Sequence, residues 1–199
     1  MCRVYNSNYW FTGPSHLSTL DFSLNSADGI AVDMEKLPEL KNLKTLLLKK
    51  CRITPPSLVD LSKFIALGSP DSLQISALTL DGIKLSGTDS LRRILGLSAD
   101  TFLPTIPCGR LELLSLTGCG LNDRDVKPLM CAIAAGNGVL IKEVRLSANR
   151  LTDTAVDYLI DQSPGTTLSL QTLDLSLNKV CSSKFFPIYR LRGSKVSPL

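Results

Sequence analysis

The sequence predicts an α/β solenoid, in which short parallel strands and returning helices alternate along the chain. One eleven-residue frame occurs six times, with apolar residues at its first, fourth, sixth and eleventh positions and Asn or Cys favoured at its ninth. The copies begin 26 to 36 residues apart, which leaves room for the crossover that parallel strands need. Leucine dominates the apolar residues and aromatics are only 6%, as expected where one buried position recurs.

The clearest copy is LQTLDLSLNKV, residues 170–180, with Asn178 at the ninth position. Asn25 and Asn149 occupy the same position in two other copies, and Cys51 and Cys119 in two more. We expect their side chains to bond backbone groups where each strand turns. The third copy departs from the pattern, because Ile83 cannot make such bonds. The six copies begin at Leu17, Leu43, Ile75, Leu111, Ile141 and Leu170.

These residues resemble the signature of the leucine-rich repeat. Intervals near 28–30 residues resemble the ribonuclease-inhibitor-like class, which includes the repeat domains of Ran GTPase-activating proteins, tropomodulins and nucleotide-binding immune receptors. The segment LSANRLTDTAVDYL, residues 146–159, carries this likeness most clearly. The resemblance implies a right-handed α/β horseshoe with a parallel sheet on the concave side and helices on the convex side. It also implies that the ninth-position residues stack as a ladder.

Three regions follow from this pattern. Residues 1–16 are a lead-in, whose aromatics cover the first repeat, form an exposed docking patch, or mark a truncated start. Residues 17–180 hold the six repeats, and residues 98–110 are read as an insertion loop. Residues 181–199 are predicted to form a C-terminal cap and a basic tail with a frayed end.

Local signals place the returning helices. Thr54 is predicted to cap a helix that ends near Gly68, and Thr152 one over residues 155–160. A helix that follows the fourth copy must hold Pro128 in about its first turn. Asp123 and Asp125 stand at the start of that helix, where carboxylates favour the helix dipole.

Charge and composition narrow the class of protein. The net charge is +4, but residues 179–199 contribute +5 and the rest sums to −1. The nearly neutral body does not favour nucleic acid, and the basic run at residues 49–52 is read as a solvated strand end. No apolar run of about 18 residues predicts a membrane span. The start of the chain does not resemble a secretory signal, so we expect a cytoplasmic protein with reduced thiols.

The sequence lacks motifs for catalysis and for binding a metal or a cofactor. The six cysteines include no C-x-x-C pair and His16 is the only histidine, so neither a metal site nor a cofactor is expected. No nucleophile elbow, phosphate-binding loop or dinucleotide-binding turn occurs. No position matches the Asn and Arg residues that Ran GTPase-activating proteins use. The sequence therefore predicts a protein without catalytic residues.

The surface expected to carry function is the concave side of the sheet, built from the third, fifth, seventh and eighth frame positions. Six strands at about 4.8 Å spacing make it roughly 24 Å wide, enough for a protein interface. We expect a monomeric intracellular scaffold that binds protein partners there. The alternatives are a module of a larger assembly of ubiquitin-ligase adaptor, GTPase-activating or actin-regulating type, and a structural role in the cytoskeleton. The candidate binding residues are Asp21, Leu47, Lys49, Lys50, Asp81, Leu113, Glu143, Arg145 and Asp174.

Overall fold

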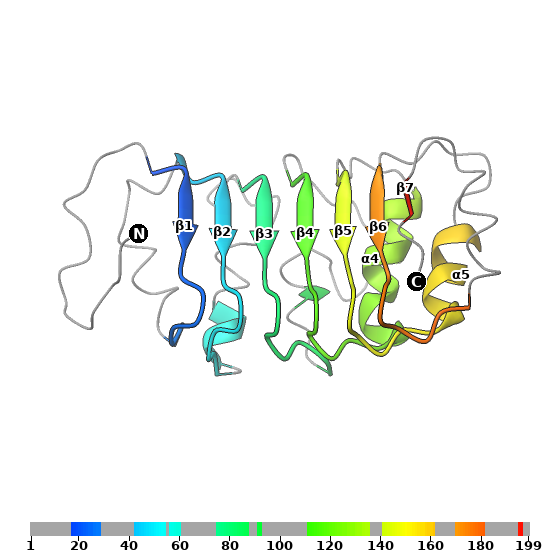
Figure 1. Ribbon diagram of the computed structural model, residues 1–199, viewed down its shortest axis with the longest axis horizontal. Helices are drawn as coiled ribbons and strands as arrows, with labels where there is room; N and C mark the ends of the chain where they lie inside the picture. The colour runs from blue at the N-terminus through cyan, green and yellow to red at the C-terminus, as the bar shows by residue number, and fades with distance from the viewer. Residues whose placement is uncertain are drawn as a thin grey trace.

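The computed structural model places parallel strands in one sheet and helices behind it (Figure 1). It describes residues 17–28, 42–54, 56–60, 75–87, 91–92, 111–135, 141–161, 170–181 and 195–196. The predicted lead-in at residues 1–16 and the insertion loop at 98–110 lie outside the described residues. The strands are β1 (Thr19–Asp21), β2 (Thr45–Leu47), β3 (Ala77–Thr79), β4 (Leu113–Ser115), β5 (Glu143–Arg145), β6 (Thr172–Asp174) and β7 (Lys195–Val196), and the helices are α4 (Asp123–Ala135) and α5 (Asp153–Asp161).

The strands lie in the sheet in the order in which they occur in the chain, and every neighbouring pair is parallel. From β1 to β6 the paired residues occupy the same frame position. Leu20 pairs with Leu46, for example, and Leu114 with Val144. This pairing confirms the alignment of the six copies that the sequence predicts.

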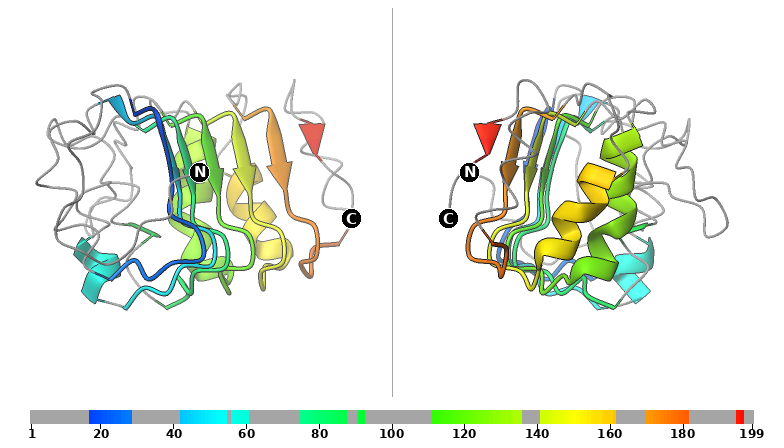
Figure 2. Two further views of the ribbon diagram at one scale, coloured as in Figure 1. Left: turned by 60° about the vertical axis from the view of Figure 1, so that its left-hand side comes forward. Right: turned by 90° about the vertical axis from the view of Figure 1, so that its right-hand side faces the viewer.

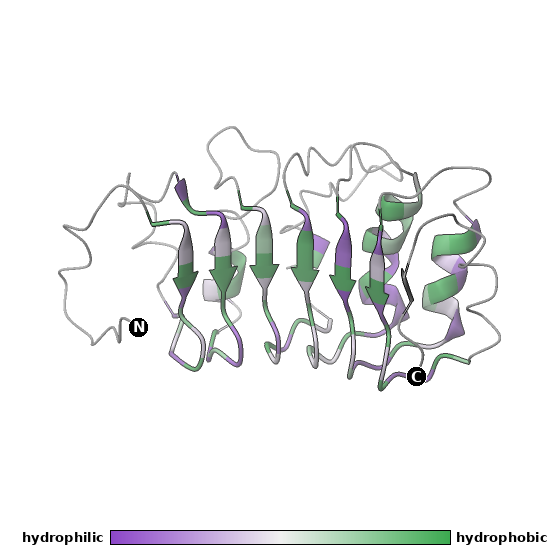
Figure 3. Cartoon of the chain, turned by 45° about the horizontal axis from the view of Figure 1, so that its top comes forward, coloured by the Kyte–Doolittle hydropathy of each residue, from purple (hydrophilic) through white to green (hydrophobic). Residues whose placement is uncertain are grey.

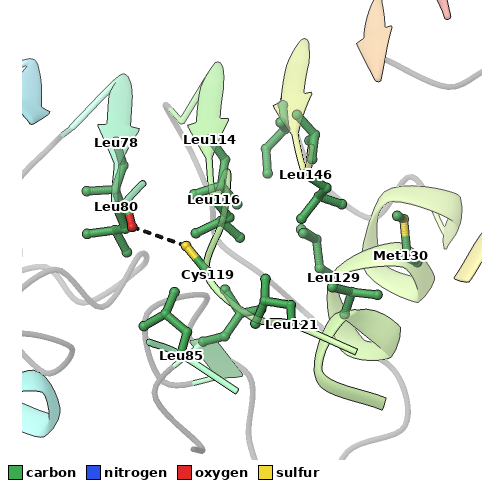
Figure 4. Close-up of a cluster of buried hydrophobic side chains, with 14 of the residues drawn as sticks. Leu78, Leu80, Leu85, Leu114, Leu116, Cys119, Leu121, Leu129, Met130 and Leu146 are labelled. Carbon is green, nitrogen blue, oxygen red and sulfur yellow. Dashed lines mark hydrogen bonds between the residues drawn. The ribbon is translucent and has the colours of Figure 1, made fainter. Parts of the chain in front are cut away.

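Side chains at the inward frame positions form one apolar core. Leu46, Leu78, Leu114, Val144 and Leu173, at the fourth position of successive copies, are all 0% exposed. Figure 4 shows the middle of this core, where side chains of neighbouring copies pack beside each other. The first copy is less complete, because its Leu17, Leu20 and Phe22 are only partly buried among the described residues.

Helices α4 and α5 pack against each other on one side of the sheet (Figure 2). Each helix buries apolar side chains, such as Leu129 of α4 and Leu159 of α5, and Figure 3 shows hydrophobic (green) and hydrophilic (purple) residues on both helices. Ala155, Val156 and Leu159 of α5 are fully buried, as the sequence predicts. Where the two helices meet, the Lys127 Nζ lies 5.2 Å from the centre of the Tyr158 ring, a cation–π contact.

The predicted helix starts are largely confirmed. The Thr152 hydroxyl accepts a bond from the Thr154 N–H at 3.3 Å, which makes it the cap of α5. Asn122 caps α4, and the Asn122 N–H in turn donates to Asp125 at 2.9 Å, a reciprocal arrangement that the sequence analysis missed. The position of Pro128 differs from the prediction. It lies in the second turn of α4, where its ring removes one interior hydrogen bond.

Where the ninth frame position holds Asn or Cys, the side chain makes the expected bonds to backbone carbonyls, and in the third copy Ile83 is buried instead. The Asn149 side chain donates to the carbonyls of Leu116 at 2.9 Å and Leu146 at 2.8 Å, and accepts the Leu121 N–H at 3.0 Å. The thiol of Cys119 donates to the Leu80 carbonyl at 3.2 Å (Figure 4). Cysteine thus replaces the bond to the preceding copy, but not the whole set that asparagine makes.

The C-terminal segment carries a strand that the sequence did not predict. Lys195 and Val196 pair with Thr172 and Leu173 as β7, parallel to β6. The expectation of a frayed end is therefore wrong for these two residues. Their backbone groups satisfy part of the sheet edge that β6 would otherwise leave open.

Candidate functional site

The nine predicted binding residues fall into two groups. Six of them lie on strands, on the side opposite the fourth-position residues: Asp21, Leu47, Leu113, Glu143, Arg145 and Asp174. The other three, Lys49, Lys50 and Asp81, lie in the turns that follow the strands. We call the third- and fifth-position side chains of β1 to β6 the sheet face. Its two large apolar members, Leu47 and Leu113, are half-buried.

The charged residues of β5 are paired with each other. The Arg145 Nε donates to the Glu143 carboxylate at 2.6 Å, along one side of the strand. Their side chains are 48% and 30% exposed, so water screens the pair only in part. An incoming partner therefore meets the ion pair of Arg145 with Glu143, and not an isolated positive charge on Arg145.

Two aspartates at the fifth position are held by a serine two residues later. Hydrogen bonds from the hydroxyl and N–H of Ser23, with a smaller effect of the Lys49 charge, hold the pKa of Asp21 below its ordinary value. Burial raises the pKa of Asp174, but bonds from Ser176 and the nearby charge of Arg145 outweigh it, so the net pKa is lowered. Both carboxylates therefore stay ionised at neutral pH.

Asp81 belongs to a network between neighbouring copies. Its carboxylate accepts the Ser115 hydroxyl at 2.6 Å and the Thr117 N–H at 2.9 Å. The Thr117 hydroxyl in turn lies 3.1 Å from that of Ser147. Although Ser115 and Ser147 occupy positions predicted to be exposed, they are 1% and 8% exposed. These short side chains lie between in-register neighbours, so this part of the surface is shallow, polar and internally bonded.

The eighth frame position has a left-handed backbone in all six copies, which sequence reasoning missed. Gly82 and Gly118 have φ values of 72° and 66°, but four copies carry a side chain there: Leu24, Lys50, Ala148 and Leu177. The conformation lets the N–H of this residue donate to the seventh-position carbonyl of the next copy, as between Lys50 and Asp81 at 2.6 Å. Gly82 and Gly118, at this position in two copies, were the sequence signal for the left-handed conformation.

Exposed cations follow these turns. The tenth position holds Arg52, Lys84, Arg150 and Lys179, all exposed. Since the ninth residue points inward, the eighth and tenth positions flank it on the outside of the turn. We call the side chains at these two positions the turn edge. It runs along the lower side of Figure 1, below the arrowheads of β1 to β6.

The buried thiols have structural roles. Burial raises the pKa of Cys51 and of Cys131, and raises that of Cys119 to about 12. The Cys51 thiol donates to the Phe22 carbonyl at 3.2 Å, as Cys119 does to Leu80. A thiol that stays protonated is a poor nucleophile, so we assign Cys51 and Cys119 a structural role in the turns.

Iodoacetamide at about pH 8 should modify Cys181 in the native protein and leave Cys119 intact, because the thiolate is the reactive form. Cys181 is exposed, whereas Cys119 is 0% exposed. Peptide mass spectrometry with and without urea measures the two sites separately. Modification of native Cys119 as fast as Cys181 would contradict this assignment.

The acidic residues at the start of α4 are engaged in holding the copies together. The Asp123 carboxylate accepts the N–H and hydroxyl of Thr152 at 2.8 and 2.7 Å, and Asp125 accepts the Gly87 N–H at 3.1 Å. Within the described ranges no three His, Cys, Asp or Glu residues gather as metal ligands. In the same part of the chain, no helix is both long and apolar enough to cross a membrane.

Comparison with models of known protein families gives no match, and comparison with curated proteins finds none of significant similarity.

Proposed function

We propose that the chain is a leucine-rich repeat solenoid of the ribonuclease-inhibitor-like class and that it acts as a non-enzymatic intracellular scaffold. Its sheet face would bind a protein partner. The observation that carries the proposal is the register of the strands. Because residues at one frame position pair from β1 to β6, their outward side chains form one continuous surface.

The composition of that surface suits a protein interface. Leu47 and Leu113 are half-buried apolar side chains on β2 and β4, two strands apart, and the Glu143–Arg145 pair lies on the neighbouring β5. Apolar groups surrounded by polar ones are typical of the centre and rim of interfaces. The short polar side chains around Ser115 allow a partner to approach closely.

A second candidate is a repeat module of a larger regulatory assembly. The observation that favours it is the basic tail after the sixth copy, with Lys184, Arg190 and Arg192 and no acidic residue. A chain of 199 residues that is monomeric and unfolds cooperatively by sedimentation and urea titration would count against this candidate.

The scaffold proposal is tested by replacing the two leucines of the sheet face with threonine. Leu47→Thr with Leu113→Thr introduces the residue that the frame carries at Thr79 and Thr45, so the fold should be kept. We expect the double variant to lose about tenfold in affinity for a partner captured from native lysate by the unmodified protein. Lys49→Glu with Arg145→Glu should also weaken binding.

The matched control is Lys142→Ser, at the second frame position, outside the sheet face. Affinity is measured by calorimetry, and circular dichroism checks that each variant is folded. If the sheet-face variants bind as tightly as the control does, the partner site lies elsewhere.

A further inference from the structure

We propose that the turn edge is a second docking surface, and that it takes an acidic stretch of polypeptide with apolar residues at its ends. This goes beyond the proposed function, because the turn edge and the sheet face use different frame positions. Two kinds of side chain carry the inference: a row of exposed cations and two exposed leucines.

The cations form two pairs in neighbouring copies, and the tenth position holds Ser26 in the first copy and Gly120 in the fourth. Arg52 and Lys84 stand in the second and third copies, and Arg150 and Lys179 in the fifth and sixth, all exposed. Lys50 adds a charge at the eighth position. Backbone bridges such as Ser26 with Arg52 keep neighbouring turns in register, at about the 4.8 Å spacing of strands. Like charges at that spacing repel, and no ion pair within the described residues relieves them.

Three carboxylates follow a tenth position by two or three residues and accept bonds from backbone N–H groups, and Asp81, three residues before Lys84, is bound to Ser115 and Thr117. Asp28 accepts the Thr54 N–H at 2.7 Å, and Asp153 accepts the Cys181 N–H at 2.6 Å. Asp123 is bound to Thr152 in the same way. These acids lower the net charge of the region, but they are committed to bonds between copies. The cationic side chains thus remain available to an outside anion.

The leucines stand near the two ends of the row. Leu24 is 76% exposed and Leu177 is 78% exposed, the two exposed large apolar side chains among the described residues. Their φ values of 65° and 56° are unfavourable for a residue with a side chain. Gly82 and Gly118 show that the turn itself needs no side chain there. Neither leucine contributes to the core. Contact with a bound partner would compensate both the exposure of the side chain and the unfavourable φ.

The dimensions and chemistry favour a polypeptide. Five steps between copies span about 24 Å, the length of about seven or eight extended residues. A bound peptide would place carboxylates along the cations and apolar groups over Leu24 and Leu177. Single-stranded nucleic acid binds by stacking bases on aromatic rings, and the eighth and tenth positions hold none in any copy.

The test uses the full chain and a labelled synthetic octapeptide, Leu-Asp-Glu-Asp-Glu-Asp-Glu-Leu, in fluorescence anisotropy. Arg52→Ser with Arg150→Ser introduces the residue that the tenth position holds at Ser26. The matched control, Lys44→Ser with Lys142→Ser, removes the same charge from the second position, where Ser18 and Ser76 occur naturally. We expect the turn-edge variant to bind about tenfold more weakly and the control less than about twofold.

A third variant, Leu24→Ser with Leu177→Ser, should also weaken binding and leave the net charge unchanged. The proposal is overturned if the two lysine replacements weaken binding as much as the arginine replacements, since net charge alone would then explain it. It is overturned equally by no binding of the peptide, or by tighter binding of a single-stranded DNA of eight nucleotides. Leu47→Thr with Leu113→Thr should keep peptide affinity, which separates this result from a failure of the sheet-face proposal.

Discussion

Replacing Leu116 by alanine is expected to lower the free energy of unfolding by about 2–5 kcal/mol. Leu116 is 0% exposed and stands at the sixth position of the fourth copy, between Leu80 and Leu146 of its neighbours (Figure 4). Its loss leaves a cavity that both neighbouring copies line. Because the sheet and α4 hold the surrounding backbone, little collapse into that cavity is expected.

The matched control for this prediction is Leu177→Ala, which removes the same atoms from a side chain that is 78% exposed. We expect a change of less than about 0.5 kcal/mol, as for most surface substitutions. Urea unfolding followed by circular dichroism measures both variants. Equal shifts in the midpoint would mean that the frame assigns inward and outward positions wrongly.

The register and the core could be predicted from the sequence because both depend on local periodicity. Leu114 and Leu173 stand three residues after the start of their copies, and a strand that buries one of them must bury its counterparts. The bonds of the Asn149 and Asn178 side chains to the backbone of the turn could be predicted for the same reason. A side chain that recurs where strands turn has few backbone groups other than those of the turn within reach.

The parts that could not be predicted depend on contacts between copies or on backbone angles. The bond between Asp81 and Ser115 joins residues 34 apart in the chain, and no periodic signal marks it. The left-handed eighth position was hidden because Leu24 and Lys50 occupy it beside the glycines. The pair of Glu143 and Arg145 was within reach of sequence reasoning, since residues two apart on a strand share a side.

Replacing Asn149 by alanine is expected to cost about 3 kcal/mol, although it removes only a few atoms. The side chain is 9% exposed, and it binds the Leu116 and Leu146 carbonyls and the Leu121 N–H. Alanine leaves these groups without their partner, and an unpaired buried polar group costs about 1–3 kcal/mol. The loss spans two copies, so it weakens their contact as well as the turn.

Two further variants separate the hydrogen bonds from the change in size. Asn149→Cys should cost about half as much, because a thiol can donate to the Leu116 carbonyl as Cys119 donates to Leu80. The Leu121 N–H then has the backbone carbonyl of residue 149 within reach, as the Leu85 N–H uses that of Cys119 at 3.2 Å.

Asn25→Ala is the exposed counterpart, since the described bonds of the Asn25 side chain lie within its own copy, to the carbonyls of Phe22 and Ser23. It should cost less than about 1 kcal/mol. Hydrogen exchange adds a local measurement: in Asn149→Ala the Leu121 amide should exchange faster than the loss of global stability explains. The exchange rate of the Leu151 amide, which is bound to Asn178 at 3.0 Å, should change only as much as the loss of global stability explains. Equal costs for Asn25 and Asn149 would show that the bonds between copies contribute no stability beyond those within a turn.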